Sequence, residues 1–226
     1  MNRSIFRTVA VIVAIASATT GCVTTEQSRA LDTPKPVAST RAYQGPRMPV
    51  SVGKFANQSS FLRGIFTDGV DRLGGQAQTI LVTQLRQSGR FNVLDRTNLT
   101  ETKQEAALLN QTQTLKGAPF VITGDISEFG RKEVGDRQLF GVLGRGKELV
   151  AYAKVSVNVV RVQTGEVAYA AQGAGEYSLS SREIVGFGTH AGYDSTLNGK
   201  VLDLAIREAV DRLAEGLESG QWGALQ

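Results

Sequence analysis

The chain has 226 residues, a formal net charge of +4, and only one cysteine and one histidine. This length supports one domain with flanking tails, and 41% hydrophobic residues exclude a disordered or collagen-like chain. One cysteine excludes an internal disulfide, and one cysteine with one histidine cannot form a His/Cys zinc site. The modest charge does not indicate a dedicated nucleic-acid-binding protein, which carries a stronger and clustered basic surface.

The first 21 residues have the pattern of a secretory signal peptide. Arg3 and Arg7 precede residues 8–18, a run of apolar and small residues. That run is shorter than the roughly 20 residues that a membrane-spanning helix needs. We therefore expect residues 1–21 to be removed, which also removes two positive charges.

Residues 19–22 (Thr-Thr-Gly-Cys) resemble the lipobox of bacterial lipoproteins, in which small residues lead to a cysteine that becomes the acylated N-terminus. Cys22 is therefore the predicted lipidation site, carrying acyl chains such as palmitate, and two or more chains give stable anchoring. Val23 rather than aspartate follows, which resembles outer-membrane sorting in Gram-negative lipoproteins. Ordinary signal cleavage that leaves Cys22 as a free thiol is the alternative.

The mature chain divides into a tether and one domain. Residues 22–49 are polar and hold four of the five prolines, which predicts a lipidated flexible tether. Residues 50–226 are predicted to form the domain. Its hydrophobic spacing predicts strands near 50–55, 90–94 and 119–126, and helices near 70–85, 97–109 and 202–217. Strands packed by three helices indicate a small α/β layer.

Residues 126–200 are glycine-rich and alternate with a period of two, which is typical of strands. The alternation predicts two β-hairpins, near residues 126–162 and 167–200. One side of these strands is weakly apolar and the other is polar or glycine-rich, which suits a membrane barrel with a wet lumen. A half-solvated soluble antiparallel sheet has the same period, so the pattern leaves both alternatives open.

Candidate chemistry is sparse. Residues 141–147 match the GxxxxGK pattern of a phosphate-binding loop, but Glu148 stands where Ser or Thr would hold magnesium, which favours a glycine-rich turn. His190 and Asp194 share one side of a predicted strand roughly 13 Å apart, too far for a catalytic dyad. We therefore expect a protein that is not an enzyme, with no catalytic residue, metal, cofactor or nucleotide.

A succession of short motifs resembles the CsgG family, which includes the curli secretion channel and holdfast-anchor lipoproteins. The resemblance spans about residues 50–222. Its motifs are AQTILVTQL (77–85), FNVLDR (91–96), VITGDI (121–126), LFGV (139–142), VSVNVVRV (155–162), TGE (164–166) and GQW (220–222).

The resemblance implies an α+β fold, a small periplasmic α/β sandwich whose two hairpins contribute to an oligomeric transmembrane β-barrel. It implies a lipid-anchored, periplasm-facing outer-membrane protein that assembles as a homo-oligomeric ring. Such a ring would serve as a secretion channel, or as an anchor for curli-like fibres or adhesins, passing unfolded secreted subunits without nucleotide. A loop near residues 57–69 would narrow the pore, with Phe66 the best match to the pore aromatic and Phe61 the second choice.

A second hypothesis is a non-pore, lipid-tethered periplasmic accessory protein that binds and regulates a cell-envelope (peptidoglycan) machine. In that case the hairpins form an ordinary soluble sheet. Charged residues in the first hairpin motivate this alternative, because a charge on the lipid side of a barrel strand costs about 2–4 kcal/mol at mid-bilayer. They are Arg131, Lys132, Glu133, Asp136 and Arg137.

Overall fold

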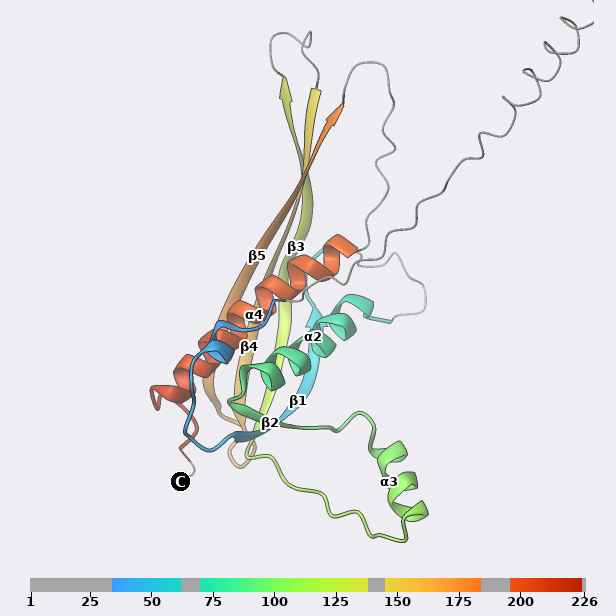
Figure 1. The fold of residues 1–226 in the computed structure, drawn as a ribbon, viewed down its shortest axis with the longest axis vertical. Coiled ribbons are helices and arrows are strands. Elements are labelled where there is room, and N and C mark those ends of the chain that lie inside the picture. The colour runs from blue at the N-terminus through green and yellow to red at the C-terminus, as the bar shows by residue number, and fades with distance from the viewer. Residues whose placement is uncertain (1–33, 62–69, 138–144, 184–195, 225–226) are drawn as a thin grey trace, which may run out of the picture. The chain divides into compact units, whose positions relative to one another are not determined.

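A five-stranded sheet with the strand order β2-β1-β3-β4-β5 organises the chain from Lys35 onward (Figure 1). The computed structural model describes residues 34–61, 70–137, 145–183 and 196–224. In chain order the elements are η1 (Val37–Thr40), β1 (Met48–Asn57), α2 (Arg72–Ser88), β2 (Phe91–Leu94), α3 (Leu99–Leu108), β3 (Phe120–Arg137), β4 (Arg145–Arg161), β5 (Val167–Glu183) and α4 (Thr196–Glu218).

The sheet is parallel at one edge and antiparallel at the other. β1 pairs in parallel with both β2 and β3, with Val50 opposite Phe120. β3, β4 and β5 then form an antiparallel meander, with Ile126 opposite Val155. This mixed sheet and its helices confirm the predicted α/β layer, and β3 with β4 forms the predicted first hairpin.

The predicted helix near residues 70–85 is α2, and its ends follow from local side chains. The Asp71 carboxylate accepts the Gly74 N–H at 2.8 Å, which caps the first turn. Gly89 ends the helix in the left-handed conformation, at φ 75°. Between these ends one apolar stripe packs on the sheet and is buried: Leu73, Ala77, Leu81 and Leu85.

α4 covers β4 and β5 and packs against α2, so these two helices lie on the same side of the sheet. Its backbone lies directly against β5. A Cβ added at Gly173 would meet the carbonyl oxygen of Ala205, and one at Gly175 would lie 2.7 Å from the carbonyl oxygen of Val201. Small residues on β5 therefore bring the helix close to the strand.

This packing decides between the two interpretations of the alternating strands for the part of them that α4 covers. Their weakly apolar side is buried beneath the helix, with Val155, Val157 and Val159 fully inaccessible to solvent. It therefore does not face lipid there. Over this stretch β4 and β5 form a half-solvated sheet, in which alanine and glycine make room for the helix backbone.

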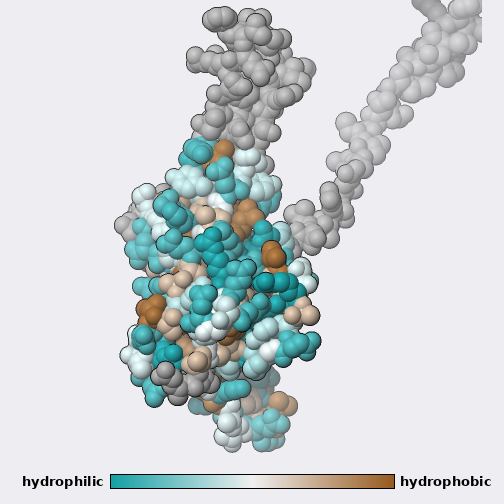
Figure 2. All heavy atoms as spheres, turned by 90° about the vertical axis from the view of Figure 1, so that its left-hand side faces the viewer, coloured by the Kyte–Doolittle hydropathy of each residue, from teal (hydrophilic) through white to brown (hydrophobic). Residues whose placement is uncertain are grey.

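The other side of the sheet carries Val121, Thr123 and Asp125 on β3, which alternate with buried residues of the helix-covered side. No described helix packs over this side. Figure 2 shows the side of the domain that lies on the left in Figure 1; it is mostly hydrophilic, with hydrophobic residues scattered singly.

Trp222 closes the core at the end where β3 begins. Its side chain is 3% exposed, and its indole N–H donates to the Leu213 carbonyl at 3.1 Å. The ring lies 6.0 Å from Phe91 and 5.4 Å from Phe120, which joins two strands to the end of α4.

Two predicted boundaries differ from the structure. The segment 22–49 is not a tether throughout, because η1 is docked on the domain and Met48 and Pro49 belong to β1. The second hairpin does not extend to residue 200, since α4 begins at Thr196 and Leu197 and Val201 start its buried stripe. Residues 184–195, where the hairpin's return strand was expected, lie outside the described residues.

Candidate functional site

Three strands continue past the start of α4 (Figure 1). Arg131 of β3 donates to the Asn198 side-chain oxygen at 2.7 Å, two residues after α4 begins. β3 then continues to Arg137, and its partner β4 begins at Arg145. β5 passes Tyr177, whose ring lies 5.1 Å below the Lys200 ammonium, and continues to Glu183. We call these extensions, residues 133–137, 145–149 and 179–183, the distal strands.

Below the distal strands, the side of the sheet that no described helix covers carries charges in cross-strand pairs. Lys154 and Glu128 lie 3.2 Å apart, and Lys132 and Glu176 lie 4.0 Å apart. Exposed pairs of this kind contribute at most about 1 kcal/mol. The exposed side chains of both pairs show that this stretch of the sheet is in contact with solvent.

The segment between β1 and α2 is fastened at both ends. At its start, the Asn57 side-chain amide donates to the Phe61 carbonyl at 2.9 Å. At its end, the Asp71 carboxylate accepts the Asn57 backbone N–H at 2.6 Å, while its other oxygen caps α2. Asn57 and Asp71 thus hold the two ends of the segment together.

Phe61 packs against the domain, with its ring centroid 4.7 Å from that of Phe129 on β3. The side chain is half-buried and belongs to the edge of the core. Phe66, the first choice for a pore aromatic, lies outside the described residues, as do Cys22 and His190. The structure therefore brings only Phe61, among these predicted residues, into a described contact.

One carboxyl group on the uncovered side of the sheet has an altered pKa. Partial burial of Asp125 between β1 and β4 raises the pKa of its side chain above the usual value. After the edge strand β2, hydrogen bonds from the Asn98 side chain and the Thr97 N–H lower the pKa of Asp95. Neither group belongs to a catalytic cluster within the described residues, which also hold no group of three or more metal-ligating side chains.

The match to GxxxxGK does not continue into a helix. From Arg145 through Lys147 and Glu148 the chain is part of β4. A phosphate would need backbone N–H groups at a helix N-terminus after the glycines. The strand instead agrees with a glycine-rich hairpin turn, whose tip at residues 138–144 lies outside the described residues.

The N-terminal strap, residues 35–47, is the feature that the sequence did not predict. The Asp211 carboxylate of α4 accepts the backbone N–H groups of Val37 at 3.0 Å and Ala38 at 2.8 Å. Ala38 is fully buried between α2 and α4. Further along, the Arg90 guanidinium donates to the Arg41 carbonyl at 3.2 Å. No periodicity in the strap signals this docking.

The family model described as the curli production assembly/transport component CsgG matches residues 31–225. The chain belongs to the CsgG family. A protein from Neisseria meningitidis serogroup B, named as a lipoprotein, is 59% identical over 215 residues, which are 95% of this chain and 96% of that protein. Membership in the CsgG family confirms the predicted resemblance.

Several solved structures share parts of this CsgG-family fold at low similarity. The PelC dodecamer from Paraburkholderia phytofirmans is 15% identical, covering 75% of this chain and 93% of that chain, with a TM-score of 0.33. Lipoprotein GNA1162 from Neisseria meningitidis is 11% identical, covering 76% and 99%, with a TM-score of 0.36. The LpoB C-terminal domain from Salmonella enterica is 17% identical, covering 58% and 85%, with a TM-score of 0.31. At these TM-scores they carry no argument about function.

Proposed function

We propose that this CsgG-family protein is a non-enzymatic lipoprotein of the Gram-negative outer membrane, anchored by acyl chains on Cys22 and facing the periplasm. Several copies assemble into a ring that exports unfolded subunits of curli-like fibres or an adhesin, or anchors them. The observation that carries the proposal is the set of distal strands, which continue past the start of α4.

The distal strands supply most of the length of a barrel strand. A transmembrane β-strand needs about 9–11 residues, and the 17 residues between Lys132 and Val150 give each strand of the first hairpin about eight residues, including its share of the turn. In lipid every backbone N–H and C=O must be paired, so an open sheet edge is excluded. One chain cannot close a barrel with so few strands, whereas a ring of copies can pair each edge with a neighbour. Within the described residues, no helix has both the length and the apolar character to cross a membrane.

Phe66 is our proposed pore aromatic. The segment that carries it starts and ends beside β1, where Asn57 and Asp71 fasten it. A ring of such aromatics narrows a channel and contacts an unfolded chain weakly. Phe61 is less suited to this role in an isolated chain, because Phe129 already holds its ring.

The test uses the full-length protein, extracted from outer membranes in detergent. Electron microscopy and light scattering should detect a ring, and planar bilayers should show channels whose conductance rises in Phe66→Ala. Phe61→Ala is the matched control, expected to lower thermal stability and leave conductance unchanged. If Cys22→Ser yields a soluble monomer without conductance, the channel proposal is contradicted, because a membrane-spanning barrel is not held in the bilayer by acyl chains alone.

The non-pore accessory role is the second candidate, and the cross-strand charged pairs favour it. They leave few residues above them for a membrane crossing, and β4 and β5 are solvated on one side for most of their length. If this role holds, the lipid-free domain should capture a peptidoglycan synthase and change its rate. Unaltered synthase activity on addition of the domain would remove this candidate.

A further inference from the structure

Between β2 and β3 the chain forms an arm that stands away from the sheet (Figure 1). The arm comprises α3 and the residues that follow it, 99–115. α3 makes no extended contact with any other described element and buries none of its own residues. Three leucines of the arm are exposed to solvent: Leu108 by 75%, Leu109 by 67% and Leu115 by 54%.

The arm is built to be helical even though nothing in the chain packs on it. At its start Asp95 accepts the backbone N–H groups of Thr97 and Asn98. At its end Asn110 adopts a positive φ of 55°, and the Gln111 N–H bonds back to the Ala106 carbonyl at 2.9 Å. Yet an isolated helix of ten residues is marginal in water, because most helical stability comes from packing an apolar side. The exposed leucines are therefore available for packing against a partner.

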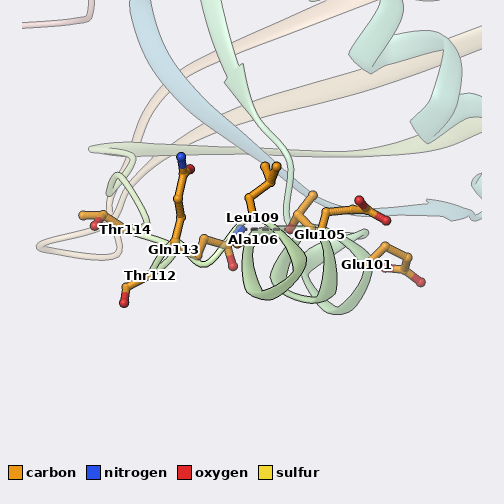
Figure 3. Close-up of a pocket in the computed structure, with 9 residues that line it drawn as sticks. Glu101, Glu105, Ala106, Leu109, Thr112, Gln113 and Thr114 are labelled. Atoms are coloured by element: carbon orange, nitrogen blue, oxygen red, sulfur yellow. Dashed lines mark hydrogen bonds between the residues drawn. The ribbon is translucent and has the colours of Figure 1, made fainter.

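The arm also forms a hollow of about 490 Å³ between α3 and the residues after it. Figure 3 shows Leu109 and Gln113 pointing to the same side of this hollow. Glu101 and Glu105 line it along the helix. The arm thus offers an apolar residue flanked by carboxylates.

A second exposed apolar pair flanks the turn between β4 and β5. Val162 is 55% exposed and Val167 is 53% exposed. The Val162 N–H donates to the Pro119 carbonyl at 3.0 Å, so the turn lies at the end of the sheet where the arm rejoins β3. The arm leaves the sheet after edge strand β2, whereas the valine pair lies beside β5, the opposite edge strand.

We propose that the arm of one copy packs its leucines on Val162 and Val167 of the next copy. Two patches at opposite edges of one sheet, at the same end, allow a head-to-tail contact, and repeated head-to-tail contacts form a ring when the rotation between copies closes. The charge beside the leucines fits this pairing: Glu105 lies one turn before Leu109 on the same side of α3, and Arg161 lies beside the valines. The inference rests on the proposed ring and names the surface that joins its subunits.

Cysteine cross-linking in the full-length, membrane-extracted protein tests the contact. We expect L109C combined with V167C to give a ladder of covalently linked chains under mild oxidation. The matched controls are L109C with V37C and L109C with V70C, because Val37 and Val70 are as exposed, at 63% and 57%. These pairs, each single variant and the unsubstituted chain should give no ladder. A charge-introducing variant, L108E/L109E, should lose the ring while keeping its thermal unfolding transition.

The outcomes separate this contact from the ring itself. A ring that forms in the L109C/V167C variant without a ladder overturns the arm contact and leaves the proposed ring standing. A ring that survives the L108E/L109E substitutions also overturns the arm contact. Cross-linking of L109C to a different protein or to an exported chain overturns it as well. Absence of any ring in the unsubstituted protein overturns both proposals.

Discussion

Asp125 and Asp95 are carboxyl groups whose surroundings shift their pKa values in opposite directions. Burial disfavours the charged form of Asp125, whereas hydrogen bonds favour the charged form of Asp95. The stability that Asp125 contributes is therefore greatest below its unfolded pKa of about 3.9 and is lost as pH rises through the folded value. The contribution of Asp95 is present above the unfolded pKa and is lost as pH falls through its lower folded value.

Asp125→Asn should therefore raise the melting temperature at pH 7 and have no effect at pH 3. Asp95→Asn should lower the melting temperature at pH 7 and lower the helical content of the arm. Neither quantity should differ from that of the natural protein in acid, where Asp95 is protonated. Thermal unfolding followed by circular dichroism at both pH values measures each effect. Equal melting temperatures for Asp125→Asn and the natural protein at pH 7 would contradict the assigned cause.

Gly173 is the residue on which the packing of α4 depends most directly. An added Cβ would lie 2.6 Å from the Ala209 backbone nitrogen and closer still to the Ala205 carbonyl oxygen. Both are backbone atoms, so no side-chain rotation can relieve the clash. We expect Gly173→Ala to lower the free energy of unfolding by about 1–3 kcal/mol. Gly75→Ala is the control, since a Cβ there meets nothing within 4 Å and alanine stabilises a helix by about 0.5–1 kcal/mol. Urea unfolding of the Cys22→Ser protein compares the two.

Among the elements, the start of the N-terminal strap is held by one carboxylate, that of Asp211. Asp211→Ala removes the acceptor of two strap N–H groups, each a hydrogen bond to a charged group, so docking should weaken by about 1–3 kcal/mol. Hydrogen exchange at the Ala38 amide should accelerate accordingly. Glu215→Gln is the control, because its 3.9 Å pair with Arg41 is exposed and contributes about 0–1 kcal/mol. Unchanged protection of Ala38 in Asp211→Ala would show that burial alone holds the strap.

The sequence predicted those elements whose pattern is local. The leucine spacing of α2 and α4 and the alternation along β4 and β5 each lie within one segment, and each element is present. What the alternation could not decide is the neighbour of the apolar side, because alanine and glycine suit both lipid and a close helix backbone. Only the contact between Gly173 and Ala205 resolves it.

Features that join distant parts of the chain stayed unpredicted. The strap looks like a tether because its acceptor Asp211 lies 174 residues after Val37. The start of α4 was missed because Leu197 and Val201 follow a glycine-rich stretch that continues the alternating pattern. The candidate site was predicted only in outline: the first hairpin is present, whereas Phe61 packs on Phe129, a contact with no local signal.

At the scale of the whole molecule, removing the distal strands distinguishes between the two proposed functions. Replacing residues 134–148 by Asn-Gly leaves Glu133 opposite Leu149 and closes the hairpin with a two-residue turn. We expect the shortened protein to keep its melting temperature, because the core lies beneath α4, and to lose all conductance. Membrane association through Cys22 provides the internal control. Undiminished conductance would place the pore elsewhere in the chain.

Docking of the strap also limits the distance between Cys22 and the domain. From Cys22 to Lys35 the chain has 13 residue steps, and a fully extended chain spans at most about 3.3–3.6 Å per residue. An acylated Cys22 would thus confine the docked domain to roughly 45 Å from the bilayer surface. If the whole strap detached from the domain, it would add a similar length of chain and nearly double this distance. With an acylated Cys22, docking of the strap through Asp211 would therefore shorten the reach of the domain from the membrane.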